Sequence, residues 1–178
     1  SLATVFASSG ADGHNCHALC EQLAGDARRI SPTRFHNSVH NAAAGYWGIA
    51  THSMAPCQVI AAFDASFGAG LLDALAQVVC DDQAVLLVAY DSEYPQPLHA
   101  KRDTPDCGGV ALLLSPQRSA ASLASITLLP CTQVADVMAD AALEALRLQI
   151  PALRALPLLQ RLAQGQSTTV VLDYLAPM

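Results

Sequence analysis

The sequence predicts an α/β fold, a mixed β-sheet covered by helices, in one domain that spans residues 1–178. Short apolar runs alternate with longer segments of helical periodicity, as in a layered fold with helices packed on a central sheet. Of the 178 residues, 52% are hydrophobic and 13% are charged. This composition excludes disordered and fibrous proteins, and the length is enough for one buried core without metal or disulfide support.

Apolar and β-branched runs predict six strands. They are Thr4–Ala7, Gln58–Phe63, Ala84–Tyr90, Gly108–Leu114, Leu123–Leu129 and Thr168–Leu172. The run Ala84–Tyr90 is the most hydrophobic, so we expect it near the centre of the sheet.

Apolar residues at helical spacing predict the helices. These are Cys16–Leu23, Asn41–Thr51, Ser66–Cys80, Val134–Leu148 and a short segment between Pro151 and Pro157. In the third helix we expect a buried stripe of Leu71, Leu72, Leu75, Val78 and Val79. The polar segment Asp26–His36 and the proline-rich segment Asp91–Asp106 are predicted to be loops.

Charge and cysteine content exclude several partners and compartments. With 9 basic and 15 acidic residues the net charge is −6, so the surface repels nucleic acid. No uninterrupted apolar run reaches the roughly 18 residues of a membrane helix, and we do not expect the first residues to act as a signal peptide. Six cysteines are too few for a secreted disulfide scaffold, and most lie in apolar segments where we expect them to be buried. These features predict a reduced, cytoplasmic protein with no membrane partner.

The high apolar fraction, combined with only 5% aromatic residues, indicates that another chain covers part of the surface. An alanine-rich genome would produce the same bias.

The segment Val59–Leu72 joins a predicted strand to a predicted helix through small residues. Such a turn presents a side chain at a helix N-terminus, where backbone N–H groups and the helix dipole favour an anion. Ser66 is the residue expected at the tip, and turns of this kind present nucleophiles. Ser66 also fits the ordinary role of a helix cap, because serine caps helices well without any chemistry.

Three blocks of sequence resemble the N-terminal half of a β-ketoacyl-acyl-carrier-protein synthase, a member of the thiolase superfamily. The first is Ser31-Pro-Thr-Arg-Phe-His-Asn-Ser-Val-His-Asn-Ala-Ala-Ala-Gly45, the second is Phe63-Asp-Ala-Ser66, and the third is Asp106-Cys-Gly-Gly-Val-Ala-Leu-Leu-Leu114. They occur in the family's order and at its approximate spacing. The resemblance implies a thiolase-like half-fold, spans roughly Thr4 to Leu114, and fades beyond it.

The departures from that family imply a supporting role. The resemblance places Ser66 where synthases keep the cysteine that carries the acyl chain, and a serine hydroxyl is a much weaker nucleophile. The family's two histidine motifs do not occur in this sequence. The chain therefore resembles a chain-length factor, and more narrowly the synthase-like proteins of bacterial aryl-polyene gene clusters. We expect Ser66 to be inactive.

As a chain-length factor, the protein would pair with an active β-ketoacyl synthase as a heterodimer and meet its acyl carrier protein. In isolation it could form a homodimer. The family resemblance implies that the segment after Ser31-Pro32 lines the floor of the partner's acyl tunnel. The residues expected at the tunnel or interface are Arg34, Phe35, Ser38, Val39, His40 and Phe67.

Two alternatives remain open from the residues alone. One is a serine acyl hydrolase that uses Ser66 with Asp91 and His99, although Asp64 replaces the first glycine of the usual Gly-x-Ser-x-Gly motif. The other is a stand-alone module that binds acyl groups or carrier protein.

Two clusters of potential metal ligands occur in the sequence: His14, Cys16, His17 and Cys20, and then His36, His40 and His52. The cysteines of the first cluster also fit the buried stripe of a helix, and the second cluster lacks the glutamate of a hydrolytic metal motif. We therefore predict no metal site and no cofactor.

Overall fold

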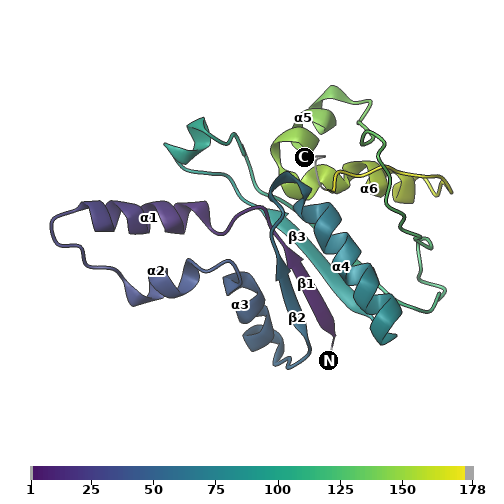
Figure 1. The fold of residues 1–178 in the computed structure, drawn as a ribbon, viewed down its shortest axis with the longest axis horizontal. Helices are drawn as coiled ribbons and strands as arrows, with labels where there is room; N and C mark the ends of the chain where they lie inside the picture. The colour runs from purple at the N-terminus through teal and green to yellow at the C-terminus, as the bar shows by residue number, and fades with distance from the viewer. Residues whose placement is uncertain (1, 175–178) are drawn as a thin grey trace.

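The centre of the molecule is a four-stranded mixed sheet with the strand order β2-β1-β3-β4 (Figure 1). The structure is a computed structural model and describes residues 2–174. Strands β1 (Ala3–Ala7), β2 (Cys57–Ile60) and β3 (Val85–Asp91) run parallel, whereas β4 (Gly108–Leu114) pairs antiparallel with β3. The predicted mixed sheet and the inner position of the most hydrophobic strand are confirmed.

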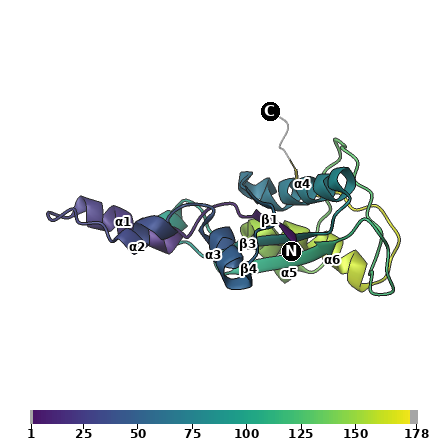
Figure 2. The same ribbon diagram turned by 90° about the horizontal axis from the view of Figure 1, so that it is seen from below.

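Helix α4 (Ser66–Asp81) covers one face of the sheet (Figure 2). Its buried side chains pack with alternate residues of β1 and β3, including Val5 and Leu87, to form the main core. The helix comes very close to the strands at Gly70, where an added Cβ would lie 2.7 Å from the Cβ of Ala7 and 3.1 Å from Cδ1 of Leu87. Glycine at this position therefore sets the distance between helix and sheet.

The opposite face of the sheet is only partly covered. Helix α3 (Ala42–Thr51) lies beside β1 on this face, where the rings of Trp47 and Phe6 meet edge to face with centroids 6.2 Å apart. Further across the sheet Leu86 is half-buried, and its partner on β4, Leu113, is 66% exposed. An apolar sheet surface therefore continues beyond the helix that shields its first part.

Helices α1 (Gly13–Ala24) and α2 (Pro32–Asn37) form an arm that projects from the sheet (Figures 1 and 2). The side chain of Asp12 caps α1, and the side-chain amide of Asn15 donates to the carbonyl of Arg34 at 2.8 Å, which ties the two helices together. Helix α2 lies in the segment predicted to be a loop. It forms because Ser31 accepts a hydrogen bond at its N-terminus and Pro32 occupies the first turn.

The C-terminal third forms a helical layer made of α5 (Ala141–Gln149), η3 (Pro151–Ala155) and α6 (Leu156–Ala163). Segment η3 contacts both α4 and the sheet. Two further short 3-10 segments are η1 (Phe63–Ala65), just before α4, and η2 (Leu98–Ala100), in the proline-rich loop. Helix α5 begins at Ala141 because the carboxylate of Asp140 accepts two backbone N–H groups there.

Several predicted elements are wrong in the structure. Residues 123–129 and 168–172 are not strands, and residues 134–140 are not helical. A backbone hydrogen bond from the Asp136 N–H to the Val171 carbonyl at 2.9 Å joins residues 134–140 to residues 168–172. No strand of residues 2–174 pairs with the backbone of residues 123–129 or 168–172. An apolar composition alone therefore does not produce a strand. In α4, Val79 is 78% exposed and lies outside the buried stripe.

The expected burial of cysteine is also wrong, because all six cysteines are exposed and free. Cys16 and Cys20 lie on outward faces of the projecting α1, where no sheet covers them. The segment Phe63–Asp81 has the length of a membrane span and a mean hydropathy of 1.3, although Asp73 interrupts its apolar run. It includes the helix that packs on the sheet, and a buried core helix satisfies the same criteria.

Candidate functional site

The turn between β2 and α4 has unusual backbone geometry at Phe63. This residue has a φ angle of 51°, in the left-handed region that bulky side chains rarely adopt. Its ring is 66% exposed. Three residues later, Ser66 begins α4 with ordinary helical angles and is only 1% exposed. The side chain presented at the tip of the turn is therefore Phe63, and Ser66 lies beneath it.

Ser66 hydrogen-bonds to the backbone of the turn. Its hydroxyl donates to the carbonyl of Phe63 at 2.6 Å and accepts the N–H of Ala62 at 3.0 Å. The single hydroxyl proton is thus committed to a carbonyl, and no base of the described residues contacts the oxygen. Because a serine nucleophile needs an adjacent base to take its proton, this arrangement stabilises the turn and does not activate the hydroxyl.

A charged network surrounds the exposed side of the turn. Arg102, from the loop between β3 and β4, lies with its guanidinium carbon 3.8 Å from the centroid of the Phe63 ring. The same guanidinium donates to Asp64 at 2.8 Å. On the far side of Asp64, Arg154 of η3 lies 3.9 Å from this carboxylate and 3.0 Å from that of Asp173. The cation over the ring and the ion pairs together hold the loop, the turn and the C-terminal segment in one place.

The residues required for a serine hydrolase are not brought together. The carboxylate of Asp91 accepts hydrogen bonds from Ser9 and from the Ala152 N–H, and burial raises its pKa. His99 lies 3.2 Å from Asp103 in an ion pair that depends on protonation. Neither group contacts Ser66 in the described part of the chain, so the arrangement lacks the base and the orienting acid of that mechanism.

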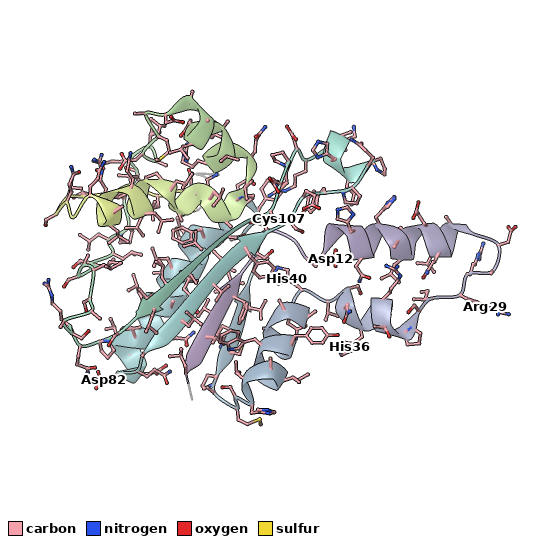
Figure 3. All side chains as sticks on the ribbon, turned by 180° about the vertical axis from the view of Figure 1, so that it is seen from behind. Asp12, Arg29, His36, His40, Asp82 and Cys107 are labelled. Atoms are coloured by element: carbon pink, nitrogen blue, oxygen red, sulfur yellow. The ribbon has the colours of Figure 1, made fainter. Side chains whose placement is uncertain are left out.

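The predicted tunnel residues of the arm lie in α2 and in the turn between α2 and α3. Phe35 is 63% exposed and Val39 is 47% exposed, and Arg34 is also on the surface. The Ser38 hydroxyl donates to the Phe35 carbonyl at 2.8 Å and so caps the end of α2. The His40 ring lies 3.0 Å from the carbonyl of Ser8, which joins the base of the arm to the end of β1 (Figure 3).

A shallow apolar groove of about 260 Å³ lies beside this part of the arm. Val39, in the turn after α2, and Tyr46 and Ile49 of α3 contribute apolar side chains to it. Ile49 is 70% exposed and Tyr46 is 50% exposed. The surface formed by Phe35, Val39, Tyr46 and Ile49 is called the arm surface below.

The remaining predicted interface residue, Phe67, is placed differently. Its side chain is 0% exposed and belongs to the core between α4 and the sheet. It has no surface to contribute to an interface, so the expectation for this residue is corrected. Phe67 is the second residue of α4, and its side chain packs towards the sheet. Phe63 precedes the helix, and its side chain stays exposed.

The predicted clusters of histidine and cysteine are dispersed. His14 lies 3.3 Å from Glu93, and His17 lies 3.3 Å from Glu21. The ring of His36 meets Tyr46 with centroids 6.5 Å apart. Residues 2–174 contain no group of three or more histidine, cysteine or acidic side chains placed to hold a metal ion.

Two residues of the site were not found by sequence reasoning. Phe63 is the last residue of a predicted strand, and Arg102 lies in the segment predicted to be a loop. No sequence signal marks the positive φ of Phe63, because phenylalanine is not a residue that favours the left-handed region. Arg102 lies 38 residues from its partner Asp64, and only the fold brings them together.

The mixed four-stranded sheet, with helix α4 packed on one face and entered by a turn from the edge strand β2, defines the class of this protein, an α/β domain with the thiolase-like half-fold. Residues 1–173 match the family described as "Beta-ketoacyl synthase, N-terminal domain". The chain belongs to this family.

One solved structure provides a specific comparison. The chain is similar to a chain of the complex of the ketosynthase ApeO with its chain length factor ApeC from Xenorhabdus doucetiae, at 31% sequence identity and a TM-score of 0.59. The match covers 65% of this chain and 50% of that chain, so the present chain corresponds to about half of its relative. A search of curated proteins finds no match.

Proposed function

We propose that this chain is a chain-length-factor-like subunit that pairs with an active β-ketoacyl synthase in fatty-acid or polyketide biosynthesis, of the aryl-polyene type. The observation that carries the proposal is the arm surface, a set of large apolar side chains on α2, α3 and the turn between them that are 47% to 70% exposed in the described chain. The similar solved structure, in which a ketosynthase is bound to its chain length factor, supports this choice of partner.

The solvent-exposed area of the chain is larger than expected for its mass, which supports a large interface with another chain. A folded monomer of 18.6 kDa exposes about 8,200 Å² by the usual scaling with mass. This chain exposes 10984 Å², which is about 2,700 Å² more than that expectation. Since a standard interface covers about 800 Å² on each partner, the excess is large enough for an extensive contact.

Within such a complex the subunit would not carry the acyl chain. The Ser66 hydroxyl is already hydrogen-bonded to the backbone of the turn. Acyl carrier protein would therefore deliver the acyl group to the partner synthase, whose cysteine would bind it. The arm would contribute Phe35 and Val39 to the floor of the partner's tunnel, where side-chain volume limits the length of the product. Six exposed free cysteines favour a reducing, cytoplasmic location.

Co-expression with a ketosynthase similar to ApeO tests the proposal. The expected result is a heterodimer of one copy of each chain on size-exclusion chromatography with light scattering. Ile49→Asp should weaken the complex about tenfold or more, because it places a charge in an apolar contact. Val134→Asp is the matched control, since Val134 is 89% exposed and lies in a loop away from the arm.

Two outcomes contradict the proposal. One is a failure of the two chains to associate at micromolar concentration. The other is equal affinity of the Ile49→Asp and Val134→Asp variants, which would place the contact elsewhere. If the isolated chain forms a homodimer that the synthase displaces, the same surface serves both associations.

A further inference from the structure

Building on the proposed function, we propose that position 63, and not position 66, is the elbow position of the turn, and that Phe63 blocks it. In a nucleophile elbow, the presented residue lies in strained backbone between strand and helix, with its side chain exposed at the tip. Phe63 meets both conditions with a φ of 51° and 66% exposure. Ser66 meets neither, with a φ of −58° and 1% exposure.

The neighbours of Phe63 hold it in this unfavourable conformation. A left-handed backbone costs conformational free energy for any bulky side chain, so it persists only where other contacts fix it. Ser66 supplies two of these contacts, through its hydrogen bonds to the Phe63 carbonyl and the Ala62 N–H. Arg102 supplies a third by lying over the ring. Ser66 and Arg102 are therefore positioning residues for the side chain at position 63.

The surroundings of position 63 would suit a thiolate. Helix α4 begins three residues later, and the positive end of its dipole favours negative charge. The Arg102 guanidinium is close by, and its charge is shared with Asp64 at 2.8 Å. A helix N-terminus and a nearby arginine both lower the pKa of a thiol and raise the fraction of reactive thiolate. Two cationic influences, the N-terminus of α4 and Arg102, thus lie beside position 63 against the one carboxylate of Asp64, and a phenylalanine ring occupies the position.

Installing a thiol tests the assignment. The Phe63→Cys and Ser66→Cys variants of the purified protein are treated with iodoacetamide at pH 7, and each cysteine is followed by mass spectrometry. Alkylation forms a sulfur–carbon bond as iodide leaves. We expect the thiol at position 63 to react about tenfold or more faster than the thiol at position 66, and faster than the native exposed Cys57 in the same sample.

An acyl-transfer readout separates reactivity from mere exposure. With an acyl thioester of N-acetylcysteamine, the thiolate at position 63 attacks the carbonyl carbon, the carbon–sulfur bond to N-acetylcysteamine breaks, and the departing thiolate takes up a proton. The expected product is a stable increase of one acyl mass at position 63. Adding Arg102→Gln to Phe63→Cys should slow both reactions, which a purely structural arginine would not do.

A glycine pair keeps the proposal falsifiable if the cysteine variants fold poorly. Phe63→Gly should leave the melting temperature unchanged or raise it, because glycine accepts a positive φ. Phe35→Gly is the control of similar exposure, and it should lower the melting temperature because it lies inside helix α2.

The proposal is overturned if the thiol at position 66 reacts as fast as that at position 63, if position 63 is no faster than Cys57, or if the two glycine variants lose equal stability. None of these measurements needs the synthase. A failed association with the synthase and a failed elbow assignment are therefore distinguishable.

Discussion

Removal of the Ser66 hydroxyl should cost stability and leave the chemistry of the complex intact. In Ser66→Ala the Ala62 N–H loses its acceptor at 3.0 Å, and the Phe63 carbonyl loses the hydroxyl donor at 2.6 Å but keeps the backbone N–H of residue 66. A buried group left without its hydrogen bond costs about 1–3 kcal/mol. These two groups are only partly buried, so we expect a total loss of about 2 kcal/mol.

The loss is measured by urea denaturation of Ser66→Ala beside Ser125→Ala, a control at an exposed loop serine. For a chain of this size, about 2 kcal/mol corresponds to roughly 4–8 °C in melting temperature. A change below about 0.5 kcal/mol, within the usual range of surface substitutions, would refute the idea that the hydroxyl holds the turn. Loss of product by the complex at unchanged stability would instead make Ser66 catalytic.

Three further predictions follow from the arm, the core and the C-terminal helices. Phe35→Ala should shift the product of the complex to longer chains, and mass spectrometry that finds an unaltered distribution would argue against a tunnel floor. Gly70→Ala should lower stability by about 1–3 kcal/mol through overpacking, whereas Gly45→Ala, with no atom within 4 Å of the added Cβ, should not. Hydrogen bonds from Arg147 hold the pKa of Glu144 at about 2, below its ordinary 4.5. Stability from this pair is therefore present above pH 4.5 and lost as pH falls towards 2, and Glu144→Gln should abolish that part of the acid dependence in urea titrations.

The sheet could be predicted because its strands are short apolar runs bounded by polar or glycine-rich segments. Strands β1, β3 and β4 agree with the predicted ranges to within a residue or so. The run at residues 123–129 has a similar composition but no strand beside it, and partners cannot be read from a local window. For α2, the Ser31-Pro32 pair was an available sequence signal of a helix start.

The site was predicted only in outline. The small residues around Ser66 predicted that the site lies at a strand-to-helix turn. They did not predict that the Ser66 side chain is buried. Helix α4 packs one side against the sheet. The backbone angles of the turn, including the positive φ of Phe63, determine which residue of its first turn faces the sheet. The contact with Arg102 depends on the path of a long loop, which local sequence patterns do not determine.

Strand β2 lies at the rim of the sheet and pairs only with β1 in the described chain. Its outer side offers a row of backbone donors and acceptors that can add another strand, which is the usual route to unwanted aggregation. In the proposed complex, a cell that made this chain well ahead of the synthase would lose part of it to such pairing. On that proposal, matched synthesis of the two chains would govern how much complex accumulates.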